Sequence, residues 1–419
     1  MSTDSYAQSQ SIAADGLDTS TASTPTAVAA ATSAAVTSAR TRALARLASI
    51  DILRGLVIVI MALDHVRDYF TGVRFDPLDL TQTSPELFLT RWITHLCAPT
   101  FIFLAGVSAW LVGRRCSRRE LSRFLFTRGV WLVVLEFTVV NWGWTFSLDY
   151  EIGLFLQVIW AIGISMVLLA ALVRLPVRWV AVIAVALIAG HNLLDGVAPA
   201  TFGRFAVLWN LLHVPGEASF GFILYPIVPW LGVMALGYAL GGIFEWDPLR
   251  RRRVLLALGS GFIAAFVVLR LLNGYGNPQP WSVQASALHT FFSFIDVHKY
   301  PPSLLYVLVT LGPGMLLLAL FDNVRGRWAQ ALQIVGRVPL FAYVMHIFVL
   351  HLAAGLVGLA MGFGTVIITS FALQYPPSWG FGLAVVYLAW IGVMLALYPM
   401  CRWFAELKQR RRDWWLSYL

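Results

Sequence analysis

Long apolar stretches, separated by short polar ones, run along most of the chain. Ten of them have about the length that a helix needs to cross the hydrocarbon core of a bilayer, roughly 20 residues. They lie near 48–69, 89–112, 122–145, 151–173, 177–195, 219–243, 252–273, 302–321, 339–361 and 381–403. The pattern predicts an all-α fold, a polytopic membrane helix bundle with about ten transmembrane helices.

The two ends of the chain differ from this pattern. Residues 1–46 are rich in Ser, Thr, Ala and Gln and have no apolar period, which predicts a disordered cytoplasmic tail. Residues 47–405 form the predicted transmembrane domain. Residues 406–419 are basic and are expected to form a short cytoplasmic C-terminal tail.

Arginines gather in alternate loops between the predicted spans. The clusters are Arg40, Arg42 and Arg46; Arg114, Arg115, Arg118, Arg119 and Arg123; Arg174 and Arg178; Arg250–Arg253; Arg325 and Arg327; and Arg402 with Arg410–Arg412. Because cytoplasmic loops carry an excess of Lys and Arg, both termini are expected to be cytoplasmic. This orientation puts His65 near the outer surface and Arg54 in the inner half of the bundle.

Composition supports a membrane protein and excludes several other classes. The 419 residues are 59% hydrophobic and 12% charged, with a formal net charge of +9 and a mean hydropathy of +0.74. In such a chain the basic excess indicates topology, and no nucleic-acid partner is expected. The three cysteines are scattered, so no disulfide framework, redox motif or metal site is expected. The chain also lacks the phosphate-binding, serine-hydrolase and zinc-protease motifs.

The first predicted span carries ionisable residues within an apolar helix. Asp51, Arg54 and His65 fall within an arc of roughly 60° at about 100° per residue. Arg54 and His65 lie ~16 Å apart along the helix axis. Because ionisable groups are costly in a bilayer, such a stripe indicates a functional site. The structural alternative is that Asp51 and Arg54 fix helix packing while His65 lies in the headgroup layer.

The same stretch resembles a known family. An apolar helix with Asp51, Leu53, Arg54 and Gly55, and with His65 eleven residues after the arginine, is similar to the first helix of the transmembrane acyltransferases. That group includes the bacterial O-antigen acetylases and the heparan-alpha-glucosaminide N-acetyltransferases. The resemblance implies that Arg54 and His65 are essential and that acyl-CoA, in particular acetyl-CoA, is the donor substrate, without a metal.

The second predicted span adds two candidate substrate-binding residues. Arg91 and His95 are four residues apart and share a helix face, and His95 lies at a depth similar to that of His65. Pro99 and Gly106 resemble the second motif of the heparan-alpha-glucosaminide branch. That branch usually has Asp where this chain has His95, so no role transfers to His95. An interfacial Arg-Trp belt with a hydrogen-bonded histidine is the structural alternative.

Two later segments resemble the same family more loosely. Lys299, Tyr300 and Ser303 match a Lys-Tyr-Pro-Pro-Ser stretch that enters a late helix, and Lys299 is a candidate for holding an anionic group. Tyr343 and His346 resemble the Tyr and His of another late helix, and both are candidate substrate-binding residues. The structural alternatives are a Pro-Pro helix start and a neutral buried histidine.

These observations together predict an integral membrane acyltransferase. It would move an acyl group, expected to be acetyl, from cytoplasmic acyl-CoA to a hydroxyl or amine of an extracytoplasmic sugar or glycolipid. His65 would act as general base or transient acyl carrier. Arg54, held by Asp51, would neutralise a phosphate or an oxyanion. The expected partners are the lipid bilayer and the acceptor, and the expected location is the bacterial inner membrane.

Two other functions are compatible with the sequence. A transporter or flippase of a polar-headed lipid or sugar would also carry charges inside the membrane and a basic inner face. No inverted repeat and no matching pair of broken helices supports it. A non-catalytic membrane scaffold is the third possibility, and the charged stripe of the first span argues against it.

Overall fold

The computed structural model describes residues 25–147, 153–411, 413 and 416. Residues 1–45 and 46–419 form two units, and each is considered by itself. In the first unit, residues 25–45 are helical, whereas the sequence pattern predicted an unstructured tail; this stretch is rich in alanine, the strongest helix former. The part of the predicted tail before Pro25 lies outside the described residues. Asp149, Tyr150 and Glu151, at the expected beginning of the fourth predicted span, also lie outside them.

The described elements are mostly helices. In chain order they are α1 (Pro25–Phe70), α2 (Pro85–Ile93), η1 (Thr94–Leu96), α3 (Cys97–Gly113), α4 (Arg118–Leu135), η2 (Glu136–Val140), α5 (Asn141–Thr145), β1 (Leu154–Leu156), α6 (Val158–Leu172), α7 (Val177–Gly190), η3 (His191–Leu194), η4 (Pro199–Phe205), α8 (Ala206–Leu212), β2 (Gly216–Ala218), β3 (Gly221–Ile223), α9 (Ile227–Leu240), η5 (Gly241–Glu245), α10 (Pro248–Leu272), α11 (Ala287–Ile295), α12 (Leu304–Phe321), α13 (Arg327–Arg337), α14 (Pro339–Ala360), α15 (Val366–Thr369), η6 (Ala372–Gln374) and α16 (Leu383–Arg410).

The predicted all-α membrane bundle is confirmed. Within the described residues, eight helical stretches are long and apolar enough to cross a membrane. They are Pro85–Gly113, Arg118–Thr145, Val177–Leu194, Ile227–Glu245, Pro248–Leu272, Leu304–Phe321, Pro339–Ala360 and Leu383–Arg410. The two remaining predicted spans correspond to the shorter apolar helix α6 and to the charged second half of α1. The side of the membrane on which each end lies stays a prediction from the arginine distribution.

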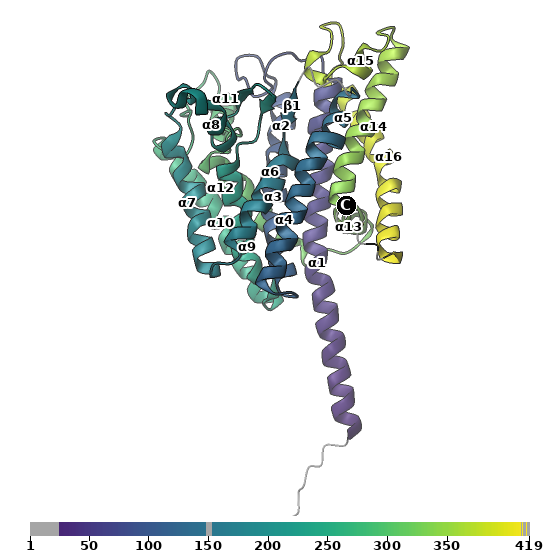
Figure 1. Ribbon diagram of the computed structural model, residues 1–419. Coiled ribbons are helices and arrows are strands. Elements are labelled where there is room, and N and C mark those ends of the chain that lie inside the picture. The colour runs from purple at the N-terminus through teal and green to yellow at the C-terminus, as the bar shows by residue number, and fades with distance from the viewer. Residues whose placement is uncertain (1–24, 148–152, 412, 414–415, 417–419) are drawn as a thin grey trace, which may run out of the picture. The chain divides into compact units, whose positions relative to one another are not determined.

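Two predicted spans begin later than expected because a small sheet takes up the residues before them. The strand order is β1-β3-β2, with β1 parallel and β2 antiparallel to β3. The fourth predicted span therefore begins at Val158 and the sixth at Ile227. Figure 1 shows β1 at the same end of the bundle as the short helices α8, α11 and α15.

Glycines allow the long helices to approach closely at their crossings. A Cβ at Gly106 of α3 would collide with the Met234 carbonyl oxygen of α9, and a Cβ at Gly237 would collide with the Phe103 carbonyl oxygen. Gly129 and Gly163 face each other in the same way between α4 and α6, as do Gly259 and Gly312 between α10 and α12. In a bilayer, where lipid competes for apolar contacts, such small residues let helix backbones pack directly.

A further glycine pair joins α13 to α1. A Cβ at Gly55 would collide with the Leu332 carbonyl oxygen, and a Cβ at Gly336 would collide with the Asp51 carbonyl oxygen. This crossing brings Arg337 Nε within 3.9 Å of Asp51 Oδ2. The glycine after Arg54 therefore serves to bring a second arginine to the inner half of α1.

The α3–α9 crossing predicts that Gly106→Ala lowers the free energy of unfolding by about 1–3 kcal/mol, because the added methyl group overpacks a backbone contact. Thermal unfolding of the detergent-purified protein measures this as a lower Tm. The matched control is Gly261→Ala in α10, where a Cβ would meet nothing within 4 Å and where alanine favours the helix. Equal Tm values for the two variants would contradict the close crossing.

Candidate functional site

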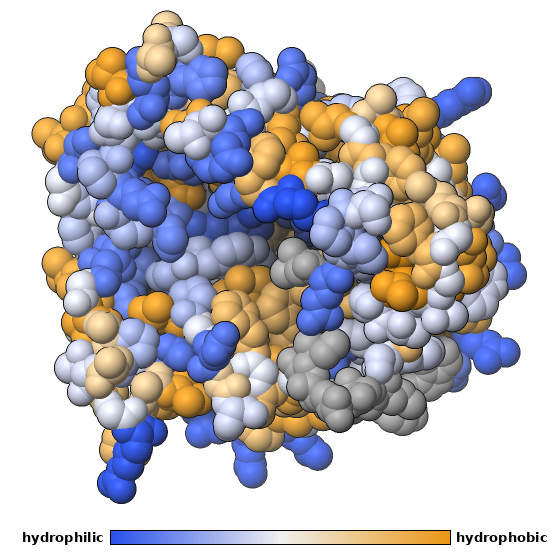
Figure 2. Space-filling view, turned by 90° about the horizontal axis from the view of Figure 1, so that it is seen from above, coloured by the Kyte–Doolittle hydropathy of each residue, from blue (hydrophilic) through white to orange (hydrophobic). Residues whose placement is uncertain are grey.

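Two chambers lie one after the other inside the bundle. The outer chamber, named for the predicted orientation, has a volume of about 160 Å³, and the inner chamber has about 360 Å³. Both are lined by Met61, Phe101, Val158 and Tyr343, so these side chains of α1, α3, α6 and α14 form the wall between them. Figure 2 looks onto the end of the molecule that carries β1 and shows hydrophilic side chains around a hollow there.

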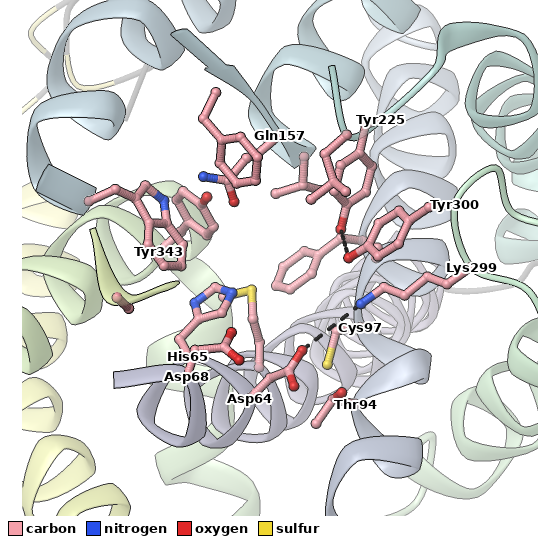
Figure 3. A pocket seen from close by; sticks show the side chains of 18 of the residues that line it. Asp64, His65, Asp68, Thr94, Cys97, Gln157, Tyr225, Lys299, Tyr300 and Tyr343 are labelled. Atoms are coloured by element: carbon pink, nitrogen blue, oxygen red, sulfur yellow. Dashed lines mark hydrogen bonds and ion pairs between the residues drawn. The ribbon is translucent and has the colours of Figure 1, made fainter. Parts of the chain in front are cut away.

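The outer chamber is polar on several sides. Figure 3 shows Asp64, His65 and Asp68 of α1 on one side of it, with Lys299, Tyr225 and Tyr300 facing them and Gln157 and Tyr343 nearby. Its other lining residues are Met61, Thr94, Cys97, Ala98, Phe101, Trp144, Phe155, Val158, Leu224, Phe371 and Ala372.

His65 is hydrogen-bonded to a second histidine from α14. Its Nδ1 lies 2.7 Å from Nε2 of His346, and the two rings stack with centroids 4.9 Å apart. Nδ1 of His346 is 3.2 Å from the carbonyl oxygen of Ala342, one turn earlier on the same helix. His346 is fully buried, whereas His65 is partly accessible from the outer chamber.

These contacts fix the protons of the neutral pair. A carbonyl oxygen can only accept, so His346 Nδ1 carries the proton and donates to Ala342, which leaves His346 Nε2 as an acceptor. His65 Nδ1 must then donate to His346 Nε2. The remaining lone pair of the dyad is on His65 Nε2, and this is the arrangement required of a base or nucleophile.

An ion cluster stands beside the dyad. The Asp64 carboxylate lies 3.0 Å from Arg67 Nη2, 3.6 Å from Arg91 Nη1 and 3.9 Å from Lys299 Nζ. Arg67 also contacts Asp68 at 2.7 Å. Asp64 therefore joins α1 to α2 and to the segment before α12, and its role is to hold the cations of the outer chamber in place.

Three residues that line the outer chamber carry hydrogen-bond donors that make no hydrogen bond of good geometry with a described residue, although Trp144 and Tyr343 approach each other. They are Nε1 of Trp144, Nε2 of Gln157 and the hydroxyl of Tyr343. Buried polar groups are almost always hydrogen-bonded, so unpaired donors around one cavity indicate a place for a polar ligand. Gln157 is held at the start of α6 by Glu136, whose carboxylate accepts from the backbone N–H groups of Gln157 and Trp160.

Tyr225 and Tyr300 form the far side of this chamber. Their hydroxyls are 3.5 Å apart, and Lys299 Nζ lies 5.0 Å from the centre of the Tyr300 ring. Burial raises the pKa of Tyr225 well above its usual value, and Tyr300 raises it further. Tyr225 therefore keeps its proton and can donate a hydrogen bond to a ligand.

The charged side chains that line the inner chamber are all basic, whereas those of the outer chamber include both acids and a base. Four cations line the inner chamber: Arg54, Arg128, Arg337 and Lys408. Arg54 Nη1 lies 3.4 Å from Asp51 Oδ1, and its Nη2 donates to the Leu104 carbonyl at 3.3 Å and to the Ser108 hydroxyl. The guanidinium is thus fixed by α1 and α3 together, and the chamber offers a preorganised site for an anion.

The structure brings several of the residues expected from sequence into the chambers. His65, Lys299 and Tyr343 line the outer chamber, with His346 directly behind His65, whereas Arg54 lines the inner one. Asp51 lines neither chamber. It contacts Arg54 and Arg337, which both line the inner chamber.

Arg91 and His95 were predicted from the sequence to bind substrate, and neither of them lines a chamber. Arg91 pairs with Asp64 and donates to Thr94 Oγ1 at 2.9 Å. His95 is buried against Tyr306, with ring centroids 5.3 Å apart, and neither of its ring nitrogens has a partner in the described part of the chain. The residue beside His65 is instead His346, because the helices turn His95 away.

Sequence reasoning missed most of the polar lining of the outer chamber. Asp68, Trp144, Gln157 and Tyr225 come from four separate segments and follow no motif. The signal that was available is the third acid of the first span, Asp68: it lies four residues after Asp64 and shares a face of α1 with it.

Comparison with known families gives one finding. Residues 46–270 match the family model described as "Heparan-alpha-glucosaminide N-acetyltransferase, catalytic". The match covers more than half of the chain and confirms the resemblance seen in the first helix. It includes Arg54 and His65 and ends before Lys299, Tyr343 and His346. A search of curated proteins gives no match.

The ion cluster predicts that Asp64→Asn destabilises the protein by about 3–5 kcal/mol, because it leaves buried cations without their anion. The Asp64 side chain is 13% exposed. Glu406→Gln is the matched control, because the Glu406 side chain is 45% exposed in its pair with Arg402 and such pairs contribute roughly 0–1 kcal/mol. Thermal unfolding in detergent measures both, and an equal loss of Tm would contradict a buried ionic hub at Asp64.

Proposed function

Because the chain belongs to the family of heparan-alpha-glucosaminide N-acetyltransferase catalytic domains, we propose that it transfers an acetyl group from acetyl-CoA to an acceptor across two connected chambers. The family match identifies a membrane acetyltransferase. The observation that carries the proposed transfer between two chambers is the position of His65. This residue, whose Nε2 is free to accept a proton, lines the outer chamber, and the outer chamber shares a wall with the basic inner chamber.

The inner chamber is the proposed site of the donor. Acetyl-CoA carries a pyrophosphate and a further phosphate, and the four cations of this chamber complement that charge. Arg54 is held in place by hydrogen bonds to Leu104 and Ser108. The thioester would then reach the wall formed by Met61, Phe101, Val158 and Tyr343, one helix turn from His65.

The outer chamber is the proposed site of the acceptor. Carboxylates, an amide, phenols and an ammonium group line it beside aromatic rings, and such a mixture can bind several hydroxyl or amino groups of a sugar at once. The acceptor is therefore proposed to be an extracytoplasmic sugar or glycolipid. The chain is a multi-pass membrane protein, and the bacterial inner membrane is the proposed location.

His65 supplies the proton transfer. In the direct reaction its Nε2 removes a proton from the acceptor hydroxyl or amine as that atom attacks the thioester carbonyl. The C–S bond then breaks, and the CoA sulfur leaves and takes up the proton from the imidazolium. In the alternative, Nε2 itself attacks the thioester carbonyl, the C–S bond breaks, and CoA leaves as the thiolate. The acceptor then attacks the acetyl-imidazolium, the acetyl group passes to the acceptor, the acceptor proton goes to the CoA thiolate, and neutral His65 is restored.

His346 and Tyr343 assist in different ways. Positive charge on His65 strengthens the hydrogen bond from its Nδ1 to His346, which stabilises the imidazolium and holds the ring. The Tyr343 hydroxyl lies in the wall between the chambers. It can accept from Trp144 and still donate its own proton to the oxyanion that forms on the acetyl carbon.

The dyad predicts a graded loss of activity. His65→Gln is expected to lower kcat by about 10²- to 10⁴-fold, the usual contribution of a general base. His346→Gln is expected to lower it by roughly 10- to 100-fold, the value of one hydrogen bond to a charged group, ~1.5–3 kcal/mol. Release of CoA thiol from acetyl-CoA in the presence of envelope sugars measures the rate.

The control for both variants is His289→Gln in α11, which lines neither chamber. Full activity of a folded, membrane-inserted His65→Gln variant would overturn the proposal. A transporter of the same fold would release no CoA thiol under any condition, and this outcome would favour the transport alternative.

The inner chamber predicts a selective effect on the donor. Arg337→Gln is expected to raise KM for acetyl-CoA about tenfold with little change in kcat, because a half-exposed charge contributes to binding rather than to the chemical step. Arg402→Gln is the control, since Arg402 is exposed and pairs with Glu406 outside both chambers. A loss of kcat without a change in KM would contradict a donor site there.

A further inference from the structure

A third cluster of ionisable residues lies outside both chambers. His191 begins η3, directly after α7, and Asp195 follows the last residue of that turn. His213 follows α8. None of the three lines a chamber, and nothing in the proposed transferase reaction uses them.

The three side chains converge on one point. One ligand atom from each lies within 4.8 Å of the other two. Nε2 of His213 is 3.5 Å from Oδ1 of Asp195, and the two imidazole rings have centroids 5.5 Å apart. His191 and Asp195 lie at the first residue and just after the last residue of the short helix η3, and α8 returns the chain so that His213 faces them.

Both histidines are buried, and their ring nitrogens have only weak polar contacts: His213 with Asp195, and His191 with the backbone at Pro302. His191 is 3% exposed and His213 is 1% exposed. Within the described residues, none of their four ring nitrogens makes a hydrogen bond of good geometry. Such nitrogens are costly to bury, and a bound cation would accept a lone pair from each ring.

Asp195 is already oriented for the same point. Its Oδ2 accepts a hydrogen bond from Asn192 Nδ2 at 2.8 Å, which leaves Oδ1 directed toward His213. The Asn192 Oδ1 in turn accepts from the backbone N–H of Leu304, the first residue of α12, at 2.8 Å. Support of a ligating carboxylate by a neighbouring hydrogen bond is a regular feature of metal sites.

We propose that His191, Asp195 and His213 bind a divalent transition-metal ion, and that zinc fits the site best. Two imidazoles and one carboxylate suit zinc, whereas calcium and magnesium prefer ligand sets made of oxygen. Tetrahedral coordination with zinc–nitrogen bonds of ~2.0–2.1 Å puts ligand atoms ~3.3 Å apart, so the three side chains, whose ligand atoms lie within 4.8 Å of one another, close in on the ion when it binds. The partly exposed side of Asp195 leaves room for water as the fourth ligand.

The ion would fasten the outer segment between η3 and α8 to the beginning of α12. That helix follows directly on Lys299 and Tyr300 of the outer chamber. The site is therefore structural, and its existence does not depend on the transferase proposal.

The test uses the full-length protein, purified in detergent, stripped with EDTA and reloaded with zinc or cobalt(II). The wild-type protein is expected to hold one zinc per chain after removal of excess metal, as measured by elemental analysis. Cobalt(II) is expected to give the intense visible absorption of a four-coordinate site. Asp195→Asn and His213→Gln are each expected to weaken zinc binding at least tenfold.

Two controls separate this site from other histidines. His289→Gln and His346→Gln should keep full zinc binding, since neither residue belongs to the cluster. Absence of stoichiometric zinc in the wild-type protein would overturn the proposal, as would equal zinc in the wild type and both cluster variants. The cobalt spectrum and a zinc-dependent rise in Tm are measured on the wild type itself, so the test stands even if a variant fails to fold.

Discussion

A carboxylate inside a membrane helix must be paired, and the second half of α1 carries such groups at two depths. Asp51 is balanced by Arg54 of the same helix and by Arg337 of α13. Asp64 is balanced by cations from three different segments of the chain. Because an unpaired charge in lipid costs several kcal/mol, these pairs oblige other parts of the bundle to gather around α1.

The two chambers follow from this arrangement. Polar groups that pair with α1 gather at the depth of Asp51 and again at the depth of Asp64, and between them α1 contributes Met61 to an apolar wall. A basic space and a mixed polar space thus meet across a few side chains. His65 lines the outer chamber beside Tyr343 of the shared wall. Its hydrogen bond to His346 orients its free nitrogen.

The buried donors of the outer chamber and the buried histidines near α8 share one property, which is that their polar atoms are poorly hydrogen-bonded. Trp144, Gln157 and Tyr343 carry buried polar atoms that make no hydrogen bond of good geometry with a described residue, and so do His191 and His213. Folding alone rarely leaves such groups unpaired. The proposed sugar-like acceptor would provide partners in the first case, and the proposed metal ion would do so in the second.

Much of the fold was predictable from the sequence because apolar length and arginine distribution respond to the membrane itself. Each of the ten predicted spans has a helix at its position, and the two late starts arise from three-residue strands that carry no distinct pattern. The stripe of Asp51, Arg54 and His65 was visible as well, since residues on one helix have fixed angular relations.

Contacts between helices were not predictable in the same way. His346 is 281 residues from His65, and the sequence offered His95 as an equally reasonable neighbour. The cluster of His191, Asp195 and His213 was not predicted because His213 is distant in the sequence from the other two and meets them only through the return of α8. The sequence by itself determined which helix carries the ionisable groups and that this helix belongs to a membrane bundle. Only the tertiary structure decided which side chains face them, because that depends on how each neighbouring helix is rotated and where glycines let it approach.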